Sequence, residues 1–213
     1  MRNFASQNQT LKQQMNQKFF TGAIAAVAFL LPNTAMGQKA DFNVIPMPQK
    51  VEMASAASPF VLNAKTCISI ANNSADMKRN ANMLAMYIEE QTGIRPVVGK
   101  AAKGAAAIVL SIDKSVKNAE GYKINVANSN ITISGSTAAG VFYGIQTLRK
   151  SLPVVKGTAS QVEIPAVNIS DAPRFAYRGT HLDVSRHFVS ADSIRQFIDM
   201  LALHNINRFH WHL

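Results

Sequence analysis

Side chains able to bind and orient a polar substrate gather near the end of the chain. Asp183, Arg186 and His187 follow one another closely, and His210 and His212 stand two residues apart in the last short run. A guanidinium offers forked donors that hold two neighbouring hydroxyls, and alternate residues of a strand share one face. These residue types predict a site for a hydroxylated ligand around Arg186, or a metal site that uses the two histidines.

The elements that must position these side chains read as a strand, a helix and a second strand. The first strand spans residues 177–184 and the second spans 207–213. Ser190 offers a helix N-cap, and Asp192 stands in the first turn, where the helix dipole favours a carboxylate. The apolar residues at the spacing of one buried helix face are Ile194, Phe197, Ile198 and Leu201. A unit of this length predicts a parallel crossover.

The same region carries a long family pattern. Residues 175–213, FAYRGTHLDVSRHFVSADSIRQFIDMLALHNINRFHWHL, contain R-G-x-x-L-D-x-x-R-H-F, then I-D-x-M/L-A and N-x-F-H-W-H-L. They closely resemble the start of the catalytic barrel in family 20 glycoside hydrolases, the β-N-acetylhexosaminidases. The resemblance implies that Arg186 lies at the mouth of a barrel, after its first strand, and binds hydroxyls of the non-reducing terminal sugar. An arginine that only bridges structural carboxylates is the alternative.

The neighbouring residues receive supporting roles from this resemblance. Asp183 and His187 flank the arginine and are expected to orient it or to stabilise the fold. His210 and His212 are expected to be support groups of the barrel interior. Arg178 lies earlier in its strand, so a structural role is expected for it, with an acid such as Asp183 or Asp199 as partner.

The implied activity removes terminal N-acetylhexosamine, GlcNAc or GalNAc, by a substrate-assisted retaining mechanism. A complete (β/α)8 barrel needs about 250 residues, whereas this chain has 213 in all. The resemblance therefore implies that the catalytic Asp-Glu pair lies beyond Leu213, and we expect the chain alone to be inactive. Residues 177–213, lacking the rest of the barrel, are expected to be loosely held.

Two other functions stay open. The chain could be a non-catalytic carbohydrate-associated or partner-binding module. It could also belong to a zinc-dependent hydrolase of the amidohydrolase type that uses His210 and His212, because a His-x-His pair on a barrel strand suits a metal. Zinc would need further ligands from other strands, and the sequence shows none. The favoured interpretation has no metal and no cofactor.

Residues 38–168 read as a separate α/β domain, and 169–213 as the incomplete start of a (β/α)8 TIM barrel. Helices are predicted over 76–91, where Gly93 supplies the C-terminal cap, and over 137–152. The segment YKINVANSNITISGSTAAGVFYGIQTLRKSL contains a predicted hairpin. It resembles the end of the non-catalytic domain of the same family, which implies a small sheet with two helices on one side.

Residues 1–37 resemble an export signal. Lys18 precedes the apolar run 19–31, and Ala35-Met36-Gly37 offers a small-x-small cleavage site; Met15 is a possible true start. The apolar run is shorter than the ~20 residues that span a bilayer. A bacterial periplasmic or secreted protein without a stable membrane anchor is expected.

The amino-acid composition limits the classes of molecule that the chain is expected to bind. The formal net charge is +10, but the basic residues are scattered and not interleaved with aromatics, which argues against nucleic-acid binding. Cys67 is the single cysteine, so no internal disulfide forms. The glycines near Gly140 lack the residues of a phosphate-binding or dinucleotide motif. The expected partner is an N-acetylhexosamine-containing glycan, and the oligomeric state is not predicted.

Overall fold

A computed structural model describes residues 38–101 and 104–213 of the chain. The expected export signal, 1–37, lies outside the described residues, so export stays a prediction. Among the residues that are described, no helix has the length and apolar character needed to cross a bilayer.

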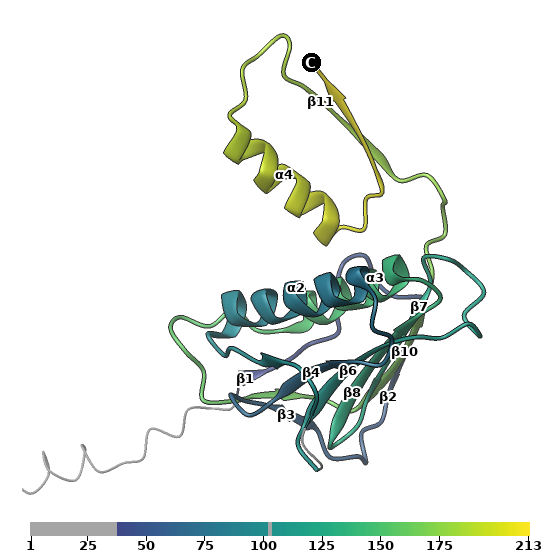
Figure 1. The fold of residues 1–213 in the computed structure, drawn as a ribbon, viewed down its shortest axis with the longest axis vertical. Coiled ribbons are helices and arrows are strands. Elements are labelled where there is room, and N and C mark those ends of the chain that lie inside the picture. Colours follow the sequence, from purple (N-terminus) through teal and green to yellow (C-terminus); the bar gives the residue numbers. More distant parts are fainter. Residues whose placement is uncertain (1–37, 102–103) are drawn as a thin grey trace, which may run out of the picture. The chain divides into compact units, whose positions relative to one another are not determined.

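A seven-stranded mixed sheet forms the centre of the domain that precedes the expected barrel (Figure 1). Its order is β2-β10-β7-β8-β6-β4-β5. The bounds are β2 Lys50–Met53, β10 Val167–Asp171, β7 Tyr122–Val126, β8 Asn130–Gly135, β6 Ala107–Ile112, β4 Cys67–Ile70 and β5 Val97–Val98. The predicted hairpin is confirmed, because β7 and β8 are antiparallel neighbours. Strands β8, β6, β4 and β5 run parallel to one another.

Two helices cover one face of this sheet (Figure 1), as the family resemblance implied. Helix α2 spans Ala75–Thr92, and helix α3 spans Ala138–Ser151. Ser74 accepts a hydrogen bond from the backbone N–H of Met77, which caps α2, and Gly93 ends it with a φ of 71°. Glycine adopts this left-handed conformation without steric cost. Thr137 caps α3 in the way that Ser74 caps α2.

The core lies between the sheet and these helices. Strand β7 alternates buried and exposed residues, so every second side chain faces the helices. Each large apolar side chain buried there contributes about 1.5–3 kcal/mol. Fully or almost fully buried members are Ile68, Leu84, Ile88, Ile108, Leu110, Ile124, Ile131, Ile133, Val141, Ile145 and Leu148.

A second, three-stranded sheet was not anticipated from the sequence. It has the order β1-β9-β3, with bounds Gln38–Lys39, Val162–Ile164 and Phe60–Leu62. Only residues 165 and 166 separate β9 from β10, yet the two strands belong to different sheets. The expected domain boundary between 168 and 169 falls inside β10. It needs correction, because β10 continues to Asp171 between β2 and β7.

The predicted strand–helix–strand unit at the end of the chain is confirmed. It consists of β11 (Gly179–Asp183), α4 (Ala191–Leu203) and β12 (Arg208–His212). The strands pair in parallel, from Gly179 opposite Arg208 to Asp183 opposite His212. Ser190 caps α4, as predicted. Of the expected buried face of α4, only Ile194 is buried within the described chain.

Candidate functional site

The carboxylate of Asp183 organises the turn that follows β11. Its Oδ1 accepts hydrogen bonds of 3.0 Å from the backbone N–H groups of Ser185 and Arg186. Its Oδ2 lies 2.7 Å from Nε of Arg186. The Asp183 side chain is only 17% exposed, whereas that of Arg186 is 76% exposed. The turn thus holds the inner edge of the guanidinium and leaves the rest facing solvent.

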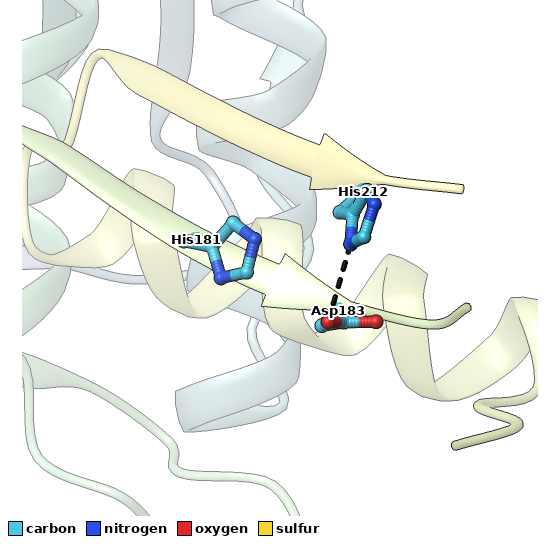
Figure 2. A group of neighbouring side chains, drawn as sticks. All are labelled: His181, Asp183 and His212. Carbon is cyan, nitrogen blue, oxygen red and sulfur yellow. Dashed lines mark ion pairs between the residues drawn. The ribbon is translucent and has the colours of Figure 1, made fainter. Parts of the chain in front are cut away.

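Histidine 212 reaches the same carboxylate from the neighbouring strand. Because β11 and β12 pair in register, Asp183 stands opposite His212, and Nδ1 of the imidazole lies 3.1 Å from Oδ2 (Figure 2). The pKa of Asp183 is lowered, first by the backbone N–H of Arg186 and further by the His212 and Arg186 side chains. The carboxylate is therefore ionised at neutral pH and suited to hold a cation in place.

Two more histidines line this face of the strand pair. His181 precedes Asp183 by two residues on β11 and so shares its face. It stands opposite His210, and the ring centroids are 4.7 Å apart. Sequence reasoning did not select His181. The signal that identifies it is the i, i+2 spacing to Asp183 on the same strand.

One group among the described residues has the composition of a cation site: His181, Asp183 and His212, whose ligand atoms lie within 4.8 Å of one another. His210, which the zinc alternative requires, is not a member. The Nε of Arg186 contacts Oδ2 of Asp183, the carboxylate that a metal in this group would also need. Because the guanidinium is always charged, it competes with a metal ion at this carboxylate.

The structure brings most of the predicted site residues together. Arg186, Asp183 and His212 are in contact, and His210 neighbours them through His181. His187 is exposed and takes no part in these contacts.

The partner expected for Arg178 was wrong. Its guanidinium lies 2.9 Å from Glu120 of the preceding domain, and not against Asp183 or Asp199. Asp183 pairs with Arg186 instead, and Asp199 on α4 is not the partner of Arg178 either.

Comparison with known proteins bears on this arrangement. Residues 41–172 match the model of glycosyl hydrolase family 20, domain 2, and residues 175–213 match the catalytic domain of the same family. The chain belongs to glycosyl hydrolase family 20. In this family 20 chain, the match to domain 2 ends just after β10, and the match to the catalytic domain begins three residues later. All of the predicted site residues lie in the match to the catalytic domain.

Curated relatives of this family 20 chain are named as hexosaminidases. A beta-hexosaminidase of Porphyromonas gingivalis is 33% identical over 206 residues, which cover 89% of this chain and 26% of that protein. A beta-N-acetylhexosaminidase of Cellulomonas fimi is 32% identical over 177 residues, 81% of this chain and 34% of that protein. The chain thus spans about a quarter to a third of their length.

Solved structures agree with the fold. The Streptomyces plicatus N-acetyl-beta-hexosaminidase in complex with Thio-NAglucal superposes with a TM-score of 0.70 at 34% identity, over 80% of this chain and 34% of that one. The beta-N-acetylhexosaminidase of Bacteroides fragilis gives 0.65 at 26% identity, over 81% of this chain and 33% of that one. The α/β fold class is confirmed.

Proposed function

We propose that this chain is the amino-terminal part of a β-N-acetylhexosaminidase that releases terminal N-acetylhexosamine from glycans. The observation that carries the proposal is the pairing of Arg186 with Asp183 directly after β11. In a (β/α)8 barrel this position belongs to the mouth where substrates bind. The names of the hexosaminidase relatives support the substrate class.

Arg186 has the chemistry to bind a sugar. Its contact with Asp183 uses Nε, and the side chain is largely exposed, which leaves the two terminal nitrogens to donate hydrogen bonds. A planar fork of donors suits two neighbouring hydroxyl oxygens on one ring. Hydrogen bonds to a charged donor contribute about 1.5–3 kcal/mol each. Arg186 therefore fixes where the sugar ring lies, while Asp183 fixes the arginine.

The bond-breaking steps need groups outside the described residues. In a substrate-assisted reaction the 2-acetamido oxygen attacks the anomeric carbon, while a carboxylic acid protonates the leaving oxygen and later activates water. Asp183 is not this acid, because its lowered pKa keeps it ionised and two basic side chains surround it. This chain supplies substrate binding, and the acid–base chemistry comes from the longer protein.

The test uses the protein encoded by the complete reading frame and a chromogenic N-acetylglucosaminide. Arg186→Lys keeps the charge but loses the fork, and we expect kcat/KM to fall about 10- to 100-fold. Arg195→Ala, which removes an exposed arginine of α4 paired with Asp192, is the control and should leave kcat/KM unchanged. An unaltered kcat/KM in Arg186→Lys would refute the assigned role. The 213-residue chain alone should show no turnover.

Export is a further part of the proposal. The basic residue, apolar run and small-x-small site within 15–37 support transfer to the periplasm or medium. Fractionation of cells, with mass spectrometry of the mature amino terminus, should find cleavage after Gly37. Uncleaved protein in the cytoplasm would contradict it.

A further inference from the structure

The Arg178 side chain connects the first domain to the start of the expected barrel, and it uses almost all of its hydrogen-bond donors to do so. Its Nε donates to the carbonyl oxygen of Asn205 at 2.6 Å, and its Nη1 donates to the carbonyl oxygen of Phe175 at 2.7 Å. The same Nη1 lies 2.9 Å from Oε2 of Glu120, and Nη2 lies 3.2 Å from the Tyr143 hydroxyl. The Arg178 side chain is only 15% exposed, and that of Glu120 is 24% exposed. The pair is therefore shielded from most of the solvent.

Glu120 also contacts the second strand of the barrel start. Its Oε1 accepts a hydrogen bond of 3.0 Å from the side-chain amide of Asn207 and one of 3.1 Å from the Tyr143 hydroxyl. One carboxylate of the first domain thus touches the residue before β11, Arg178, and the residue before β12, Asn207. We call Glu120, Tyr143, Arg178 and Asn207 the junction cluster.

The backbone groups of the junction cluster begin the pairing of the two strands. The N–H of Arg178 donates to the Asn207 side-chain oxygen at 3.0 Å. The carbonyl oxygen of Arg178 accepts from the N–H groups of Asn207 and Arg208 at 2.9 and 3.1 Å. Gly179 then stands opposite Arg208, and the register continues to Asp183 opposite His212. A slip of one residue would turn every later side chain to the other face.

The loop that carries Glu120 is itself held by helix α3. The Thr137 hydroxyl, which caps α3, donates to the carbonyl oxygen of Ala119 at 2.6 Å. The N–H of Glu120 donates to the Asn118 side chain at 2.8 Å. Tyr143, one turn into α3, holds Glu120 from the other side. The Glu120 carboxylate thus has contacts within the first domain in addition to those with Arg178 and Asn207.

We propose that Glu120 is a positioning residue of the first domain, which sets the register of β11 and β12 through Arg178 and Asn207. By that register it brings His212 to Asp183 and holds the turn that carries Arg186. The first domain then acts as the template on which the barrel begins. The proposal concerns the described chain and does not depend on hydrolase activity, although it explains how the proposed sugar-binding arginine is placed.

The test measures amide hydrogen exchange in the 213-residue chain by NMR, without substrate. In the wild type we expect the amides of β11 and β12 to exchange faster than those of β7 and β8, because only Ile194 of α4 is buried. They should nevertheless be protected relative to an unfolded chain, because the junction cluster holds the start of both strands. In Glu120→Ala they should exchange at least tenfold faster, while those of β7 and β8 stay as slow as before, which shows that the first domain is folded. Arg178→Lys should have a similar effect, because a lysine cannot make the four contacts of the fork.

The matched control is Asp113→Asn. Asp113 lies in the same connection before β7 and pairs with Lys123 at 3.1 Å, but it makes no described contact beyond β10. In Asp113→Asn, the amide hydrogens of β11 and β12 should exchange at the same rates as in the wild type. Cross-relaxation between the rings of His181 and His210 reports the register itself and should vanish in Glu120→Ala. Equal protection of β11 and β12 in wild type and Glu120→Ala would overturn the proposal, and so would unprotected strands in the wild type.

Discussion

Asp183 and His212 face each other across the parallel strand pair, with Oδ2 of the carboxylate 3.1 Å from Nδ1 of the imidazole. Each residue is the last of its strand. The contact therefore closes the end of the pair from which Arg186 projects. Because the carboxylate also holds Arg186, the strand pairing and the position of the Arg186 side chain depend on one charged group.

Protonation of Asp183 should loosen this end of the strand pair. Its pKa is lowered from the ordinary 3.8 by donors present only in the folded chain. The contribution to stability is thus complete above about pH 3.8 and is lost as the pH falls through the lowered value. Trp211, the single tryptophan, lies on β12 and reports the change by its fluorescence. At neutral pH, Asp183→Asn should give the Trp211 fluorescence that the wild type gives only in acid. Asp192→Asn, the control, should give the fluorescence of the wild type at neutral pH. If Asp183→Asn also gave the neutral wild-type fluorescence, the ionised Asp183 would not hold this end of the strand pair.

Removal of the Tyr122 hydroxyl should weaken the first domain. This phenol is buried, lies 2.7 Å from the Thr147 hydroxyl and donates to Oδ2 of Asp171 at 2.8 Å. Tyr122→Phe leaves Thr147 without this partner, so we expect the free energy of unfolding to fall by about 1–2 kcal/mol. Urea unfolding followed by circular dichroism measures it. Tyr177→Phe, at an exposed tyrosine, is the control and should change the midpoint little.

A methyl group at Gly140 should push the Glu120 loop away from α3. A Cβ there would overlap the carbonyl oxygen of Gly121, which is backbone and cannot turn aside. Alanine favours a helix by about 1 kcal/mol over glycine, but overpacking costs about 1–3 kcal/mol. Gly140→Ala should therefore lower the melting temperature despite its better helix propensity. Gly99→Ala is the control, because a Cβ there meets no atom within 4 Å. An increased melting temperature for Gly140→Ala would show that the Glu120 loop can move aside at little energetic cost.

Replacement of Lys150 should stabilise the chain near neutral pH. Its Nζ is buried without a hydrogen-bond partner among the described residues, and burial lowers its pKa to about 8, although the charge of Asp171 opposes this. The unfolded chain binds this proton more tightly, so stability rises as the pH increases from about 8 towards 10.5.

Lys150→Met should thus raise the free energy of unfolding at pH 7 by about 1 kcal/mol, with a smaller gain at pH 10. Chemical unfolding of both forms at the two pH values checks this. Lys117→Met, at an exposed lysine, is the matched control. A gain that does not depend on pH would mean that packing, and not charge, causes the effect.

Local patterns in the sequence predicted the local structure well. Helix α2 starts after Ser74 and stops at Gly93 because capping groups and a glycine with left-handed backbone act within one turn. The β7–β8 hairpin and the parallel β11–β12 pair follow from alternation and from the crossover rule. The family resemblance supplied the arrangement of helices on one side of the sheet.

The sequence did not predict which residues far apart in the chain contact one another in the fold. Arg178 was assigned an acid near it in the chain, whereas the structure pairs it with Glu120 of another domain. The positions of charged residues in a sequence do not show which distant carboxylate will pair with a given arginine in the folded chain. The same limit explains why β9 and β10, short and separated by two residues, were not assigned to two different sheets.

The place of β10 between β2 and β7 has a consequence for the order of events during synthesis. The ribosome releases the chain from its amino terminus at about 5–20 residues per second. Until Asp171 emerges, the facing edges of β2 and β7 have no strand between them, and the nascent domain carries two open edges. Arg178 follows within about a second or two of the last residue of β10. Strand β10 can therefore fill the gap between β2 and β7 before β11 leaves the tunnel, so β11 does not meet either of these edges open.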